Sequence, residues 1–233
     1  MKKLLLVAFA VCLAAPVYGV QLNEWISNDT STDDYEFIEL YGNPGEDLTG
    51  LSIVLIEGES TKGMVDNIIS LDGYFTDAAG YFVVGDALVL PDIELSPGWI
   101  ENGGNTIILV SGLEADVAVG VTDVDIDDDC VEDRTIGTIV DAVGYGYGYG
   151  AADCITYFGA VPVGPDGNYD PAGAARCEGT WAMICMDGSE PAGTGCTLPD
   201  YEVGFATPGG LNDCLSSTAT DNSTWGGVKS LYR

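Results

Sequence analysis

The clearest β-strand signal in the chain comes from two neighbouring segments, Q-L-N-E-W-I-S-N-D at 21–29 and D-Y-E-F-I-E-L-Y-G-N-P-G-E-D-L-T-G at 34–50. Two short runs of strand-forming residues are joined by a polar turn cluster, and the second run closes on Asn-Pro-Gly and then on Leu-Thr-Gly. Residues 36–41 alternate, so that Phe37 and Glu39 point to one face while Ile38 and Leu40 point to the other. The opening therefore predicts two β-strands rather than a helix.

The rest of the chain repeats this pattern. Short runs rich in Val, Ile, Tyr and Phe are bounded by Gly, Pro, Asn or Asp, and no segment shows a long helical period. The expected strands are 20–26, 36–41, 51–56, 67–71, 81–84, 106–110, 115–121 and 138–145. Short strands at this spacing predict an all-β sandwich. The expected core residues are Ile38, Leu40, Ile53, Leu55, Phe82, Val84, Ile108 and Val140.

The composition fits one β-rich domain. The chain has 233 residues, 46% of them hydrophobic, which is enough to form a core and argues against disorder of the whole. It contains 32 glycines, which suit a chain of many short strands joined by tight turns.

Further motifs follow the opening in a fixed order. They are Y-F-V-V-G at 81–85, W-I-E-N-G at 99–103, V-D-A-V-G-Y at 140–145 and A-T-P-G-G-L-N at 206–212. Together with the opening, they resemble the lamin tail domain family in its bacterial secreted form. The resemblance covers roughly residues 20–214. It implies an immunoglobulin-like β-sandwich that acts as a binding or scaffold module.

The two ends of the chain differ from this body. Residues 1–19 read as a signal peptide, with Lys2 and Lys3 before an apolar run that is too short for a confident membrane span. We therefore expect cleavage, no membrane span afterwards, and a protein that is secreted or held at the cell surface. Residues 20–214 form the predicted domain, 215–224 a polar linker, and 225–233 a short C-terminal tail.

Cysteine usage agrees with export. Of seven cysteines, Cys12 leaves with the signal peptide. An even number in an exported chain predicts about three disulfides, with the connectivity left open. The candidates are Cys130, Cys154, Cys177, Cys185, Cys196 and Cys214. All six lie in the second half, which is therefore expected to be loop-rich and stapled by disulfides.

The charge excludes one class of partner. The chain has 37 acidic and seven basic residues, and two of the basic ones are removed with the signal peptide. Such a surface repels phosphate backbones, so nucleic-acid binding is not expected. An unknown protein or glycan at the cell surface is the expected partner.

The strongest local motif is D-V-D-I-D-D-D-C-V-E-D at 123–133. Within it, Asp125, Asp127, Asp129 and Asp133 match the D-x-D-x-D-G-x-x-D calcium loop, except that Cys130 stands where Gly is usual. Carboxylates at alternate positions of a turning loop can converge on Ca²⁺. The predicted cofactor is therefore Ca²⁺, with a solvated acidic loop as the open alternative.

Two aromatic segments are further candidates. Residues 144–150 alternate Gly and Tyr, and as a strand they would place Tyr145, Tyr147 and Tyr149 on one face. That stripe is either a possible binding face or a cover for a neighbouring loop. The tail W-G-G-V-K-S-L-Y-R is either a sorting or attachment signal or a terminal strand. Its candidate residues are Trp225, Gly226, Lys229, Tyr232 and Arg233.

The leading functional hypothesis is a secreted, non-catalytic binding or scaffold module. The chain has no histidine, which excludes Ser-His-Asp and Cys-His catalysis. One alternative is a calcium- or carboxylate-dependent extracellular hydrolase, since carboxylates are plentiful. Another is a surface-layer protein that associates with itself.

Overall fold

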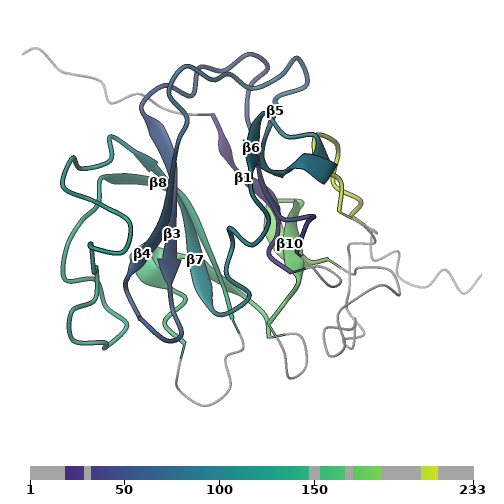
Figure 1. Cartoon of the computed structure of the whole chain (residues 1–233). Helices are drawn as coiled ribbons and strands as arrows, with labels where there is room; N and C mark the ends of the chain where they lie inside the picture. Colours follow the sequence, from purple (N-terminus) through teal and green to yellow (C-terminus); the bar gives the residue numbers. More distant parts are fainter. Residues whose placement is uncertain (1–18, 29–32, 147–152, 166–169, 185–205, 215–233) are drawn as a thin grey trace, which may run out of the picture.

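A computed structural model of the chain describes residues 19–28, 33–146, 153–165, 170–184 and 206–214. Two β-sheets pack face to face (Figure 1). The predicted all-β sandwich is confirmed. Neighbouring strands are antiparallel except for two pairs, β5 with β6 and β8 with β9, which are parallel.

The first sheet has six strands in the order β11-β10-β1-β2-β5-β6, and the second has five in the order β4-β3-β7-β8-β9. The strands of the first sheet are β1 (Gln21–Ile26), β2 (Phe37–Tyr41), β5 (Tyr81–Asp86), β6 (Ile93–Leu95), β10 (Gly173–Cys177) and β11 (Thr180–Met183). Those of the second are β3 (Leu51–Glu57), β4 (Val65–Ser70), β7 (Asn105–Ser111), β8 (Thr138–Tyr145) and β9 (Val161–Val163). Two short 3-10 turns, η1 (Ala87–Val89) and η2 (Tyr157–Gly159), lie between strands.

All expected strands but one are present, with their ends shifted by at most two residues. The strand expected at 115–121 is wrong. That segment turns back on itself, with the Val117 amide bonded to the Glu114 carbonyl and the Thr122 amide to the Ala118 carbonyl. Its valines favour a strand, but Asp116 and Gly120 favour turns. Val117 instead packs on the second sheet.

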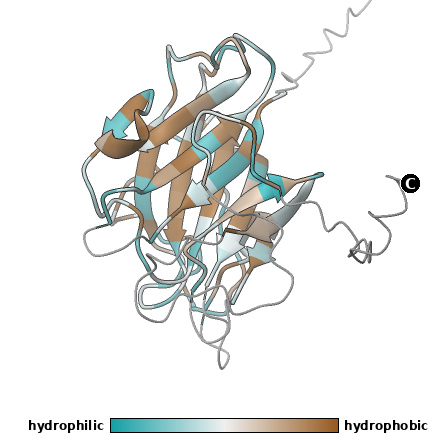
Figure 2. Ribbon diagram, turned by 90° about the vertical axis from the view of Figure 1, so that its right-hand side faces the viewer, coloured by the Kyte–Doolittle hydropathy of each residue, from teal (hydrophilic) through white to brown (hydrophobic). Residues whose placement is uncertain are grey.

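The five-stranded sheet is covered on both faces and the six-stranded sheet on its inner face and on part of its outer face, which gives three apolar layers. The central layer lies between the sheets and contains residues such as Leu40, Ile53 and Phe82. A second layer covers the outer face of the five-stranded sheet, and a third covers part of the outer face of the six-stranded sheet. The strands accordingly carry predominantly hydrophobic residues (Figure 2). Each fully buried aliphatic side chain contributes about 1.5–3 kcal/mol.

Seven of the eight expected core residues are buried. The exception is Val140, which is only partly buried. The register between β7 and β8 shifts at this point, where Leu109 pairs with Asp141 and Val110 with Ile139. Val140 is therefore the extra residue of a β-bulge, and a bulge turns its side chain away from the regular alternation.

Tyr145 does not belong to an exposed face, which corrects the prediction of a binding stripe. Its side chain is fully buried at the end of β8. The ring stacks on Trp25 with centroids 4.3 Å apart, and the hydroxyl donates to the Glu101 carbonyl oxygen at 2.9 Å. The aromatic pair bridges the two sheets, because Trp25 lies on β1. Tyr147 and Tyr149 lie outside the described residues.

Two disulfides staple the second half of the chain, as expected. They join Cys130 to Cys154 and Cys177 to Cys214. Cys185 and Cys196 lie outside the described residues, so the third disulfide stays a prediction. Disulfides indicate an oxidising environment. Among the described residues, no helix has the length and apolar character needed to cross a membrane.

We predict that the mature protein has no free thiol, because Cys185 and Cys196 are the two cysteines left to pair. The measurement is thiol labelling of the denatured, unreduced protein followed by mass spectrometry. The expected result is no label, whereas a reduced sample takes up six labels per chain. Two labels on the unreduced protein, at Cys185 and Cys196, would contradict the prediction.

Candidate functional site

The outer face of the six-stranded sheet carries three rows of side chains across β1, β2 and β5. In that strand order, the rows are Gln21, Tyr41 and Tyr81; Glu24, Glu39 and Val83; and Ile26, Phe37 and Gly85. Each row joins residues that lie directly opposite one another, so their side chains share a face. The third row packs with apolar residues that include Val89 of η1 and Ile184, which follows β11.

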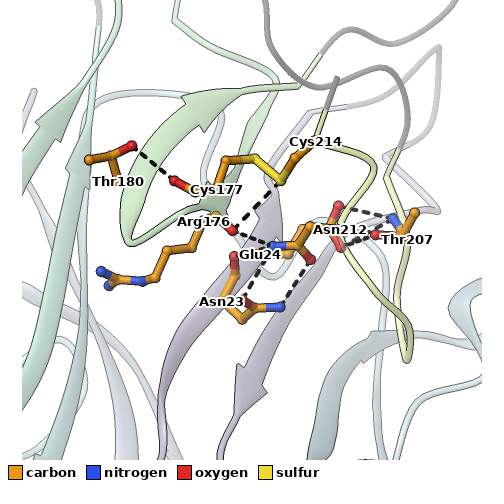
Figure 3. The surroundings of a disulfide bond; sticks show 8 residues. All are labelled: Asn23, Glu24, Arg176, Cys177, Thr180, Thr207, Asn212 and Cys214. Atoms are coloured by element: carbon orange, nitrogen blue, oxygen red, sulfur yellow. Dashed lines mark hydrogen bonds between the residues drawn. A yellow bond between two sulfur atoms is a disulfide. The ribbon is translucent and has the colours of Figure 1, made fainter. Parts of the chain in front are cut away.

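The second row is covered by residues 206–214, which we call the clasp. The Thr207 amide and hydroxyl donate to the Glu24 carboxylate at 2.9 and 3.1 Å, and the Gly209 amide donates to the Glu39 carboxylate at 2.6 Å. The Cys177–Cys214 disulfide ties the end of the clasp to β10 (Figure 3). A segment remote in sequence thus supplies the hydrogen-bond donors for two buried acids.

Two asparagines complete this contact. The Asn23 side-chain amide donates to Asn212 Oδ1 at 3.0 Å, and the Asn212 amide donates to Asn23 Oδ1 at 3.2 Å and to the Arg176 carbonyl at 2.9 Å (Figure 3). The Asn23 amide also donates to Glu39 at 2.6 Å. Asn23 can take part because β1 has a bulge between Leu22 and Glu24.

Three glutamates are fully buried, and burial alters their titration. Removal from water raises the pKa of Glu24 to about 7 and that of Glu39 to about 8. For Glu39, the negative charge of the neighbouring Glu24 raises the pKa further. Glu36 accepts hydrogen bonds from the Trp99 and Ile100 amides, yet burial raises its pKa to about 8 as well. Desolvation outweighs the hydrogen bonds in all three.

Within the described part of the chain, no segment covers the first row, which forms one side of a hollow of about 440 Å³. Its lining includes Gln21, Asn23, Tyr41, Tyr81, Glu178, Leu211 and Asn212. This volume falls within the range of about 300–1,000 Å³ that is usual for ligand pockets. Leu211 of the clasp stands at the edge with 85% of its surface exposed.

Two tyrosines dominate the wall of this hollow. Tyr41 and Tyr81 lie opposite each other on β2 and β5, with ring centroids 5.0 Å apart and the rings inclined by 42°. Tyr41 is 41% exposed. Within the described part of the chain, no hydrogen bond engages either hydroxyl or the side-chain amide of Gln21. These groups are available to a ligand.

Arg176 lies at the boundary between this hollow and a second one of about 490 Å³ beside β9 and β11. Its guanidinium is engaged within the protein. It donates to the Leu22 carbonyl at 3.0 Å and to Asp141 at 2.7 Å, and it lies 4.6 Å from the centre of the Trp181 ring. The ion pair joins β10 of one sheet to β8 of the other, so its role is structural.

The acidic loop forms a second candidate site. Asp125, Asp127 and Asp133 each offer an oxygen, and these atoms lie within 4.8 Å of one another. The group could hold a metal ion. Asp129, the fourth predicted ligand, is not in this group, and its carboxylate accepts the Val131 amide at 2.9 Å.

The loop holds its shape through internal contacts. Asp125 is buried and accepts hydrogen bonds from the Asp129 amide, the Cys130 amide and the Tyr157 hydroxyl, at 3.0, 2.9 and 2.7 Å. Cys130 occupies the position at which calcium loops usually have glycine. Its backbone takes the left-handed conformation (φ +67°) that glycine adopts easily. Its disulfide to Cys154 attaches this turn to the rest of the domain.

Charge crowding in the loop is visible at Asp127. The neighbouring carboxylate of Asp129 raises the pKa of this exposed group, with smaller contributions from desolvation, Asp133 and Asp125. Any cation bound between these carboxylates would relieve that repulsion.

The remaining predicted site residues lie elsewhere. All five candidate residues of the tail are outside the described residues. The Tyr41 and Tyr81 pair and the acids Glu24 and Glu39 are not among the site residues that the sequence predicts. The alternation at 36–41 places Phe37, Glu39 and Tyr41 on one face, but only the strand order shows which residues stand opposite them.

Comparison with known protein families, with curated proteins and with solved structures finds no match for the chain.

We predict that the folded protein loses stability as the pH rises from about 5 to about 9. The folded-state pKa values of Glu24, Glu36 and Glu39 lie above their ordinary value of 4.5, so the folded protein binds these protons more tightly than the unfolded chain. Their contribution is fully present below about pH 4.5 and is lost as the pH passes through 7 to 8. The loss should be on the order of a few kcal/mol, or roughly 5–10 °C in Tm.

Thermal melts at several pH values measure this effect. Glu39→Gln removes one titrating group but keeps an acceptor for Gly209, so its Tm should fall less steeply with pH than that of the wild type. Glu94→Gln on the exposed side of β6 removes the same charge and should keep the wild-type slope. Identical slopes for the two variants would count against the role of Glu39.

Proposed function

We propose that this chain is a secreted, non-catalytic binding module of lamin-tail type, which acts at the bacterial cell surface or in the extracellular medium. One observation carries the proposal: described residues cover most of the outer faces of both sheets, yet they leave the tyrosine row open beside a ready-made hollow. Exposed aromatic residues in a concave site with a few polar groups are typical of binding sites.

Several features support the lamin-tail assignment. The quoted motifs occupy positions of structural consequence. V-D-A-V-G-Y belongs to β8 and contributes both the Asp141 ion pair and the buried Tyr145. A-T-P-G-G-L-N is the main part of the clasp, and L-T-G at 48–50 leads into β3. Export is supported by the signal-like residues 1–19 and by the two disulfides.

A hydrolase is less well supported. Glu24 and Glu39 are a facing pair of carboxylates with raised pKa, which is the arrangement that such an enzyme needs. Both side chains, however, are fully buried, and their oxygens accept hydrogen bonds from the clasp. A substrate would have to displace the clasp to reach them, so we assign the pair to the fold.

The proposed function is tested by binding of the mature protein to envelope fractions and glycans. Tyr41→Ala should abolish most of the retention, because it removes an exposed ring without touching the core. Phe75→Ala serves as the matched control, since Phe75 is 56% exposed and does not line the hollow. Equal retention of wild type and Tyr41→Ala would refute the assignment of the hollow.

The same experiment separates binding from sorting, which we propose as the role of residues 225–233. Deletion of the tail should leave binding by the purified protein and its Tm unchanged, while cell-attached protein moves to the medium. A fall of several degrees in Tm with unchanged location would instead assign the tail to the fold.

We further propose that the acidic loop binds Ca²⁺ and that the ion stabilises the protein. The oxygens of Asp125, Asp127 and Asp133 are the hard ligands that Ca²⁺ prefers, and backbone carbonyls or water can complete its shell. Asp125 is already oriented by three hydrogen bonds, which lowers the entropic cost of binding.

At a calcium concentration of about 100 times Kd, the stabilisation should be about 2.7 kcal/mol, or roughly 5–10 °C in Tm. Extracellular calcium sites commonly have Kd values of about 10⁻⁴–10⁻³ M. Melting curves with calcium and with chelator should differ for the wild type and for Glu94→Ala, but not for Asp127→Ala. A calcium response that survives in Asp127→Ala would locate the site elsewhere.

A further inference from the structure

We propose that the tyrosine-lined hollow binds a neutral glycan, with a sugar ring packed on the side chains of Tyr41 and Tyr81. This inference rests on the proposed function and names the ligand class of that same site. It follows from three properties of the described lining of the hollow: its aromatic wall, its uncharged polar groups and the engagement of its guanidinium within the protein.

The aromatic wall is a fixed platform. Tyr41 and Tyr81 are direct neighbours on β2 and β5, so the sheet itself sets their spacing of 5.0 Å. The flat face of a pyranose ring exposes C–H groups, which pack on an aromatic ring, while its hydroxyls project from the edge. Two rings inclined by 42° present a shallow angled surface to such a ligand.

The polar groups around this platform both donate and accept hydrogen bonds. The two tyrosine hydroxyls and the Gln21 amide have no hydrogen-bond partner within the described part of the chain. Gln21 stands directly opposite Tyr41, so its amide lies beside the platform. Hydroxyls of a sugar also donate and accept, and planar amides match adjacent pairs of them. Asn23 and Asn212 are bonded to each other and form a rigid part of the lining.

A charged ligand fits less well. Arg176, the basic residue of the described lining, has its guanidinium committed to Asp141 and to the Leu22 carbonyl. The described lining therefore offers no free cation to a phosphate, sulfate or uronate. The whole chain carries a formal net charge of −30, which repels anions further. Among the described lining residues, a basic ligand would meet one exposed carboxylate, that of Glu178, and exposed pairs contribute little.

The experiment is a calorimetric titration of the mature chain. The neutral probes are pentasaccharides of glucose, xylose, mannose and N-acetylglucosamine. The comparison probes are an oligogalacturonate, a proline decapeptide and a lysine decapeptide. We expect at least one neutral saccharide to bind, with the affinity lowered about tenfold or more in Tyr41→Ala and in Tyr81→Ala. Tyr41→Phe keeps the ring and should stay within about threefold of the wild type, and Phe75→Ala should be unchanged.

Two results would overturn the glycan assignment. One is the absence of binding by every neutral saccharide. The other is binding that neither tyrosine substitution weakens. Retention of envelope material through Tyr41, combined with binding of only the proline or lysine peptide, would leave the binding module standing and refute the glycan. Loss of envelope retention together with a lack of saccharide binding would refute both. Unchanged Tm values show that the variants are folded.

Discussion

Two acids that stand opposite each other on neighbouring strands set the constraint on which the outer face of the first sheet depends. Like charges in such positions are destabilising, and buried carboxylates need donors. Glu24 and Glu39 obtain them from Thr207 and Gly209, which lie 183 and 170 positions further along the chain. The chain must therefore return to β1 and β2 near its end. The Cys177–Cys214 disulfide holds it there, and such a bridge contributes about 2–4 kcal/mol.

The clasp also determines what remains exposed. It covers the glutamate row but not the adjoining row with Tyr41 and Tyr81, and its own Leu211 and Asn212 line the hollow. The same segment therefore donates hydrogen bonds to the two buried acids and forms part of the wall of the hollow. A substitution in the clasp would move the part of the wall that the clasp forms. It would therefore alter the hollow even if the substituted residue contacts no ligand.

The sequence predicts the strands whose residues have high strand propensity. It misses the strands that form only because they pair with neighbouring strands. β3 and β8 are rich in β-branched residues and were expected within one residue of their observed ends. β10 reads Gly-Ala-Ala-Arg-Cys, which has low strand propensity, and it forms because it pairs with β1 and β11. β9 contains Pro162, which is tolerated because the strand lies at a sheet edge. Likewise, the acidic loop is a contiguous motif that the sequence reveals. The clasp and the tyrosine pair join residues from distant parts of the chain, so no local motif predicts them.

The glutamate pair under the clasp and the acidic loop show two ways in which crowded carboxylates can be stabilised. Under the clasp, burial raises the pKa of Glu24 to about 7 and that of Glu39 to about 8, so both carboxyl groups titrate near neutral pH. Hydrogen-bond donors of the protein stabilise them. In the loop, Asp127 is exposed, and its pKa is raised chiefly by the charge of Asp129. Donors cannot remove repulsion between charged neighbours in water, whereas a divalent cation can. The buried pair therefore suits a permanent contact, and the loop suits a reversible one.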